Sequence, residues 1–127
     1  MVTYPLGDAL IQIKNAAMAN RREVVLDNSK IIESVMRVME DQKLLSKVEL
    51  DDKKLKVTLA YHKKAPVIIN IRLVSTPGLR HYMSVDELKS RKRRNASILV
   101  ISTPKGVMAS PQAEKERAGG EVIAEIW

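Results

Sequence analysis

Hydrophobic residues near the start of the chain recur at the spacing of a helix. The apolar positions are Leu6, Leu10, Ile13 and Ala17. Each lies three or four positions after the one before it, and Asp8, Gln12 and Lys14 point elsewhere, which predicts an amphipathic helix. Pro5 fits the first turn of this helix, because a backbone N–H would have no helical partner there.

A strand, a second helix and a pair of strands are predicted to follow. The first strand covers 23–26, and Asn28 or Ser29 then caps the second helix. The apolar face of that helix consists of Ile31, Val35, Val38 and Met39. Apolar residues alternate with mainly polar ones over 54–61, which is typical of a strand with one buried face. The first half is therefore expected to run helix, strand, helix, strand, strand.

The second half is predicted to be mostly strand. Segment 67–74 is largely apolar on both faces, which favours a strand buried between layers rather than one at a sheet edge. The apolar run 98–101 and the segment 121–127 predict two more strands. A single turn of helix is expected at 84–88, and the basic run 91–94 is interpreted as a loop.

One further short helix is expected near the end of the chain. Ser110 and Pro111 are suited to open it, and Gly119 with Gly120 to close it. The fold class is therefore predicted to be α/β, of the α+β kind. An N-terminal α-β-α-β-β half packs against a mostly antiparallel β C-terminal half with a short helix.

Two domains are predicted, 1–64 and 65–127. The segment 61–66 is interpreted as the linker, because Pro66 lacks a donor and biases the preceding residue toward extended geometry. At 127 residues and 45% hydrophobic content, the chain can bury a core. Aromatic residues make up only 3% and Phe is absent, so aliphatic side chains and Met must fill that core.

The absence of cysteine excludes a disulfide framework, a thiolate zinc site and a cysteine nucleophile. No apolar run approaches the roughly 18 residues that span a bilayer. The N-terminus also lacks the pattern of a signal peptide. These observations lead us to expect a soluble, cytoplasmic protein.

Positive charge is concentrated in the second half. The formal net charge is +7, and the stretch 72–105 holds eight basic residues against two acidic ones. A basic zone of this kind is the electrostatic footprint of a polyanion such as nucleic acid. A solvated basic face and an anionic membrane surface are the alternatives that charge alone leaves open.

Catalytic and metal chemistry find no support in the pattern of side chains. His62 lies beside two lysines and His81 next to a turn, and neither has a patterned nucleophile or carboxylate partner. No metal-ligand spacing is present, and 104–106 lacks the glycine spacing of a phosphate-binding loop. We expect no enzyme activity, no metal and no cofactor.

The turn Ser102–Gly106 is the most informative local feature. Small hydroxyls and a glycine after a buried strand allow close approach of a ligand, and the shallow minor groove of RNA suits short side chains on a rigid turn. An ordinary surface turn is the alternative. Tyr82 could stack on a base and Arg80 could pair with phosphate, although a sheet-edge tyrosine and a solvated arginine are equally ordinary.

Four segments, in order, resemble the family of bacterial-type small-subunit ribosomal protein eight. They are Pro5–Ala16 (PLGDALIQIKNA), Ser75–Tyr82 (STPGLRHY), Ile101–Met108 (ISTPKGVM) and Gly119–Trp127 (GGEVIAEIW). The resemblance covers essentially the whole chain, and the last two motifs in tandem are specific. It implies a structural constituent of the small ribosomal subunit that binds the central domain of its RNA during assembly.

The resemblance also implies where RNA binds. In the C-terminal half the implied contacts are Ser102, Thr103, Lys105 and Gly106, with Tyr82, Arg80 and Glu121 nearby. A second, weaker contact with backbone phosphates falls on Lys14, Asn15 and Lys30. The expected partners are central-domain ribosomal RNA, neighbouring ribosomal proteins with number five first, and the protein's own messenger RNA. Membranes and DNA are not expected partners, and the ribosome, including an organelle ribosome, is the expected location.

Two departures from the family pattern bear on RNA binding. Pro104 stands where the family usually has a second serine, so one hydroxyl and one N–H are lost from the loop. The basic run Arg91, Lys92, Arg93 and Arg94 replaces a glycine-containing stretch, and we expect it to add phosphate contacts. The alternative functions are a translational repressor that binds messenger RNA and a scaffold whose main partners are proteins.

Overall fold

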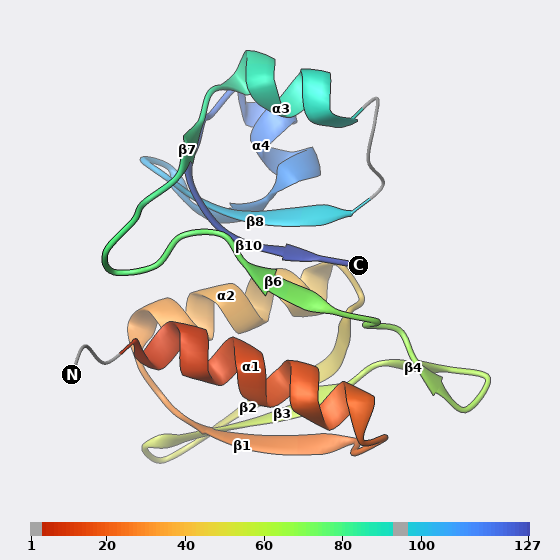
Figure 1. The fold of residues 1–127 in the computed structure, drawn as a ribbon. Coiled ribbons are helices and arrows are strands. Elements are labelled where there is room, and N and C mark those ends of the chain that lie inside the picture. The colour runs from red at the N-terminus through yellow and green to blue at the C-terminus, as the bar shows by residue number, and fades with distance from the viewer. Residues whose placement is uncertain (1–3, 93–96) are drawn as a thin grey trace.

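The computed structural model describes residues 4–92 and 97–127. The fold is α+β, as predicted, and its elements stack as four layers (Figure 1). A three-stranded sheet lies at one end, followed by the helices α1 and α2, a larger sheet, and the helices α3 and α4. The larger sheet therefore has helices on both faces.

The N-terminal half has the predicted order of elements. They are α1 (Pro5–Met18), β1 (Glu23–Asp27), α2 (Lys30–Asp41), β2 (Leu45–Asp51) and β3 (Lys54–Leu59). The strands form an antiparallel sheet in the order β1-β3-β2. Ser29 caps α2 through its hydroxyl, which accepts a hydrogen bond from the N–H of Ile32 at 3.3 Å. The alternation in β3 buries Leu55, Val57 and Leu59, as the pattern predicted.

The segment expected as a linker forms a small hairpin. Its strands are β4 (Tyr61–His62) and β5 (Ala65–Pro66), and they pair with each other alone in a two-stranded sheet. Lys63 and Lys64 make the turn between them.

The C-terminal half is a mainly antiparallel sheet with two helices. Its elements are β6 (Ile71–Leu73), β7 (Tyr82–Met83), α3 (Val85–Lys92), β8 (Ile98–Thr103), β9 (Gly106–Ala109), α4 (Ser110–Glu116) and β10 (Gly120–Ile126). The sheet order is β6-β10-β8-β9, and β7 also pairs with β10. Both helices expected in this half are present, and α3 has eight residues and α4 seven.

The expectation for 67–74 was wrong in two respects. Only Ile71–Leu73 is a strand, and it lies at the edge of the sheet because β10 is its single partner. The N–H groups of Ile69 and Asn70 instead donate to the carbonyl of Trp127, at 2.7 and 3.0 Å. Ile69 is 71% exposed, so its apolar character does not report burial.

Helix α3 continues beyond the single turn that was expected. The hydroxyl of Ser84 accepts from the N–H of Glu87, and the carboxylate of Glu87 accepts from the N–H of Ser84, both at 3.2 Å. This capping box satisfies two backbone donors at the start of the helix. The helix then runs to Lys92, so the first part of the basic run is helical rather than a loop. Arg93 and Arg94 lie outside the described residues.

The two faces of β8 pack against different cores, which explains its uninterrupted apolar sequence. Val100 joins the core that includes α1 and α2. Leu99 and Ile101 join a second cluster with residues of α3 and α4. The first core also takes in Ile71 and Ile126, so it continues from the N-terminal half into the C-terminal sheet.

Candidate functional site

Three polar side chains line up across neighbouring strands at one end of the larger sheet. Glu121 of β10 is directly opposite Ser102 of β8 on one side and Tyr82 of β7 on the other. Residues directly opposite in an antiparallel pair project from the same face. Ser102, Glu121 and Tyr82 therefore form a row, which we call the polar row.

Arg80 joins the polar row through an ion pair. Its Nη1 donates to Oε2 of Glu121 at 3.0 Å, and this hydrogen bond raises the pKa of the guanidinium above its ordinary value. The arginine side chain is 47% exposed, whereas that of Glu121 is 19% exposed. The carboxylate is thus neutralised at the surface, and the arginine still presents donors to solvent.

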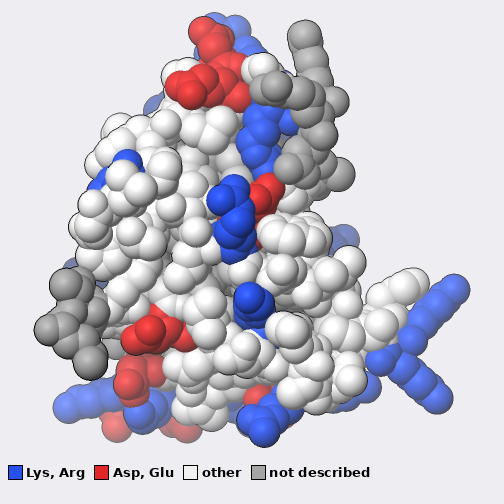
Figure 2. Space-filling model, in the orientation of Figure 1, with Lys and Arg blue, Asp and Glu red and all other residues white. Residues whose placement is uncertain are grey.

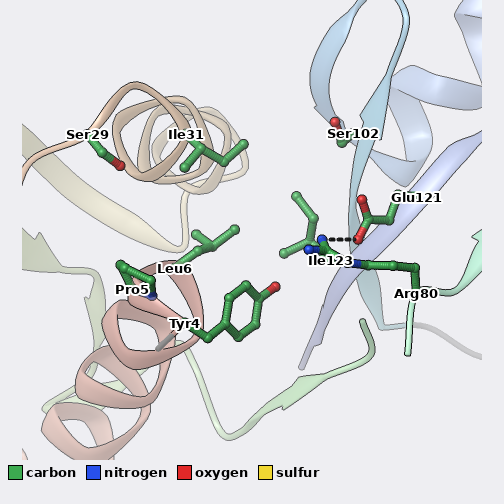
Figure 3. A pocket seen from close by; sticks show the side chains of 9 residues that line it. All are labelled: Tyr4, Pro5, Leu6, Ser29, Ile31, Arg80, Ser102, Glu121 and Ile123. Atoms are coloured by element: carbon green, nitrogen blue, oxygen red, sulfur yellow. Dashed lines mark hydrogen bonds and ion pairs between the residues drawn. The ribbon is translucent and has the colours of Figure 1, made fainter. Parts of the chain in front are cut away.

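A cavity of about 320 Å³ opens beside the polar row, between the two halves of the chain (Figure 3). Its lining residues are Tyr4, Pro5, Leu6, Ser29, Ile31, Arg80, Ser102, Glu121 and Ile123. Its walls are mostly apolar, and its polar groups come chiefly from the C-terminal sheet. Partial burial raises the pKa of the Tyr4 hydroxyl above its ordinary value.

The turn between β8 and β9 is held by Thr103. Its hydroxyl donates to the carbonyl of Gly106 at 2.8 Å and accepts from the N–H of Lys105 at 3.1 Å. Thr103 is 8% exposed, whereas Pro104, Lys105 and Gly106 are exposed. The threonine shapes the turn from inside, and the three residues that follow form its outer surface.

Gly106 leaves open space on the outer surface of this turn. Its φ is +121°, a conformation that other residues rarely adopt, and nothing lies within 4 Å of where a Cβ would stand. The Nζ of Lys105 donates to the carbonyl of Glu116 at 3.1 Å, and this side chain remains 59% exposed. Its charge is thereby held close to the turn.

Two glycines bring the strands of the polar row together, a role that the sequence did not reveal. A Cβ on Gly120 would lie 2.1 Å from the carbonyl oxygen of Ser102. One on Gly119 would lie 2.6 Å from the carbonyl oxygen of Met83. We expected this pair to close α4, but Arg117 takes that place with φ 52°. A glycine pair at the start of a strand was the available signal for close backbone approach.

Arg91 has a different environment from the one expected for a phosphate-binding loop. Its Nη2 lies 2.6 Å from Oε2 of Glu125, which also accepts from the Ser97 hydroxyl at 2.6 Å. Arg72 donates through Nε to Oε1 of the same carboxylate at 3.0 Å. Arg91 is only 18% exposed and neutralises a buried acid. The side chain of Lys92 and both Arg93 and Arg94 lie outside the described part of the chain.

These interactions strongly favour the charged form of Glu125. The hydrogen bond from Ser97 is the largest effect on its pKa, burial opposes it, and the hydrogen bonds from Arg91 and Arg72 act in the same direction as Ser97. The pKa of Glu125 is lowered to about 2. At neutral pH the charged carboxylate therefore links β10 to Arg72 of β6, to Arg91 of α3 and to Ser97, which precedes β8.

The residues expected to make a second RNA contact are Lys14, Asn15 and Lys30, and neither the groove lined by Asn15 nor the groove lined by Lys30 contains all three. Asn15 is exposed and lines a groove between α1 and β1, whereas Lys14 is half-buried on α1. Lys30 is exposed and lines a different groove beside Arg37. Neither groove includes a residue of the polar row.

Over residues 4–92 and 97–127, no group of three or more His, Cys, Asp or Glu side chains is arranged to hold a metal ion. None of the helices described there has both the length and the apolar character needed to cross a membrane.

Comparison with known proteins gives one consistent result. A family profile described as "Ribosomal protein S8" matches residues 4–127. The "Small ribosomal subunit protein uS8" of Nitratidesulfovibrio vulgaris (strain Miyazaki F) is 35% identical over 127 residues, covering all of both chains. Proteins of the same name from Nautilia profundicola and Mycoplasma mobile are 39% and 34% identical, and each match covers 100% of this chain and at least 98% of the other.

Proposed function

This chain belongs to the ribosomal protein S8 family, whose members are structural proteins of the small ribosomal subunit and not enzymes, and from that premise we propose how it binds RNA. It binds the central domain of small-subunit ribosomal RNA directly and organises that domain during assembly. The β8–β9 turn and the polar row provide the principal contact surface.

The alignment of Ser102, Glu121 and Tyr82 across three strands carries this proposal. Their spacing is set by strand pairing, so the row is rigid before RNA arrives, and binding need not order it. The minor groove of RNA displays 2′-hydroxyls and base edges on a shallow surface. The Ser102 hydroxyl and the Glu121 carboxylate can bond to such groups, and Tyr82, which is 68% exposed, can stack on an unpaired base.

The β8–β9 turn adds close approach and charge. Gly106 lets the RNA surface come near the backbone, because no side chain stands in between. Lys105 and Arg80 supply positive charge on either side of the row. Pro104 has no N–H to offer, and it stiffens the turn that Thr103 shapes.

Binding to two RNAs of equal length tests the proposal. The purified protein is titrated with an irregular hairpin from the central domain and with a perfectly paired duplex, across a series of salt concentrations. A preference for the hairpin that persists at high salt is expected, because shape recognition does not depend on counterion release. Equal binding to both RNAs that vanishes with salt would contradict it.

Substitution in the polar row tests the contact surface itself. Ser102→Ala should weaken binding to the irregular hairpin about fivefold, which corresponds to about 1 kcal/mol for one lost hydrogen bond. Ser46→Ala is the control, since Ser46 is an exposed residue of β2 in the other half of the chain. Equal effects of the two substitutions would argue against the assigned surface.

The same surface supports a second RNA partner. A rigid turn that reads shape binds a messenger RNA site with the same irregular hairpin, so we include repression of the protein's own messenger in the proposal. Competition between the two RNAs for one site is the expected result, and simultaneous binding would oppose it. Neighbouring small-subunit proteins, number five first, are the proposed protein partners, and the cytoplasm is the proposed compartment.

A further inference from the structure

The hairpin β4–β5 carries positive charge that no acidic side chain balances within 4–92 and 97–127. Lys63 and Lys64 form its turn and are exposed. Across the described residues neither lysine takes part in an ion pair, and neither do Arg21 and Arg22, which directly precede β1. Glu23 is the next residue along β1, and it pairs with Lys56 at 3.4 Å.

The turn residues themselves are poorly suited to the turn. Lys63 and Lys64 have φ of 51° and 68°, so both occupy the left-handed region. A two-residue hairpin turn of this type favours Asn or Gly at these positions, because a side chain is crowded there. Two consecutive lysines are therefore unfavourable for the fold, and their charge calls for a separate explanation.

Contacts at the base of the hairpin join it to the segment that holds the two arginines. The guanidinium of Arg22 lies 4.3 Å from the ring centroid of Tyr61, a cation–π contact. The hydroxyl of Tyr61 donates to the carbonyl of Arg21 at 3.3 Å. The two lysines of the hairpin turn and the two arginines beside its base form a set that we call the hairpin cluster: Arg21, Arg22, Lys63 and Lys64.

The hairpin cluster and the β8–β9 turn lie on opposite sides of the molecule (Figure 1). In the same orientation, the blue side chains that reach furthest from the body stand at the edge occupied by this hairpin (Figure 2). Arg21 also lines the groove between α1 and β1, together with the amide side chains of Gln12 and Asn15. The cluster therefore faces a different direction from the polar row and continues into a polar groove.

We propose that the hairpin cluster binds the sugar–phosphate backbone of a second RNA segment, distinct from the one held at the polar row. Exposed cations that make no ion pair in the described residues suit phosphates, and phosphate contacts carry no sequence information directly. The inference rests on the proposed function, because it adds a second contact to an RNA already bound elsewhere.

A variant that loses charge without losing the fold tests this inference. Lys63→Asn combined with Lys64→Gly removes two charges and places residues that the turn favours, so its thermal midpoint should stay the same or rise. The matched control is Lys43→Gly with Lys53→Gln. Lys43 also has positive φ (63°), and both control lysines are exposed and without an ion pair in the described ranges.

Binding to two RNAs distinguishes the hairpin cluster from the polar row. One is the irregular RNA hairpin alone, and the other is the longer central-domain RNA. The Lys63→Asn/Lys64→Gly variant should bind the isolated RNA hairpin with an affinity within about twofold of the parent protein's. Its affinity for the longer RNA should fall roughly fivefold to tenfold at low salt. The slope of log affinity against log salt for the longer RNA should decrease in magnitude by about one to two, as expected for one or two lost phosphate contacts. The control should leave that slope unchanged.

Three results would overturn the inference. The first is that the hairpin variant binds the longer RNA as the parent does. The second is that variant and control lose affinity equally for both RNAs, which would reflect net charge alone. The third is that the variant binds both RNAs normally but loses a neighbouring ribosomal protein. Failure of the proposed function gives a different result, since the parent protein would then not prefer the irregular hairpin over a paired duplex.

Discussion

At the scale of single residues, Gly120 is the residue on which the polar row most depends. Gly120→Ala would put a Cβ 2.1 Å from the carbonyl oxygen of Ser102, and both atoms are held in place by the backbones of paired strands. We expect the free energy of unfolding to fall by about 2–4 kcal/mol, as for other overpacked sites. Urea unfolding of the variant and the parent protein measures this change in the free energy of unfolding.

Gly78→Ala is the control for this substitution. Nothing lies within 4 Å of a Cβ at Gly78, and its φ is not in the left-handed range. A change within about 0.5 kcal/mol is expected there. If the two alanine variants were equally stable, strands β8 and β10 would have to separate at no cost, contrary to their observed pairing.

The lowered pKa of Glu125 leads us to predict that stability depends on pH. Its folded pKa of about 2 lies below the ordinary value of 4.5, so the folded state favours the charged carboxylate. This contribution is fully present above about pH 4.5 and is lost as the pH falls toward 2; it amounts to roughly 3 kcal/mol. Glu125→Gln should therefore lower stability at pH 7 and flatten the curve between pH 4.5 and 2.

The comparison is made by urea unfolding at pH 7, 4 and 2.5. Glu49→Gln is the control, because Glu49 forms an exposed pair with Lys47 that is expected to contribute at most about 1 kcal/mol. A Glu125→Gln variant that kept the parent's acid sensitivity would place the responsible carboxylate elsewhere.

At the scale of elements, α3 depends on its capping box. Ser84→Ala removes a hydrogen bond to the first turn and should reduce stability by about 1 kcal/mol. Fraying of α3 would also loosen Arg91, which is in the last turn and contacts Glu125. Hydrogen exchange of the amides from Leu88 to Arg91 should accelerate. Exchange as slow as in the parent protein would mean that packing on α4, and not the cap, holds the helix.

Elements with strong local signals were predicted correctly from the sequence. Helix α1 follows from the spacing of its apolar residues, and β3 follows from strict alternation. Helix α2 was also placed correctly, but Ile31 and Val38 were wrongly assigned to its buried face. Ile31 is 40% exposed and Val38 is only partly buried, because Ile32 and Met36 face the core instead. Segment 67–74 was misjudged, because an apolar run does not reveal how many partner strands it has. The extent of α3 was also missed, because a high density of basic residues was taken as the mark of a loop.

At the scale of the whole molecule, one core connects the two halves. It contains Ile13 and Met36 from the first half together with Ile71, Val100 and Ile126 from the second. We therefore expect one cooperative unfolding transition, although two domains, 1–64 and 65–127, remain a sequence prediction. Circular dichroism reports all helices and the fluorescence of Trp127 reports the C-terminal sheet, so the two curves should coincide. Two separated transitions would instead mean that the halves unfold independently.

The sequence by itself determined most of the elements, the fold class and the family, because these depend on local periodicity and on motifs that occur in order along the chain. It also pointed to Ser102, Tyr82 and Glu121, through resemblance. Only the tertiary structure decided that these three form a row, that Arg91 neutralises a buried acid, and that Arg22 lies against Tyr61. The physical reason is that strand register and ion pairing join residues far apart in the chain, and neither leaves a periodic signal in the sequence.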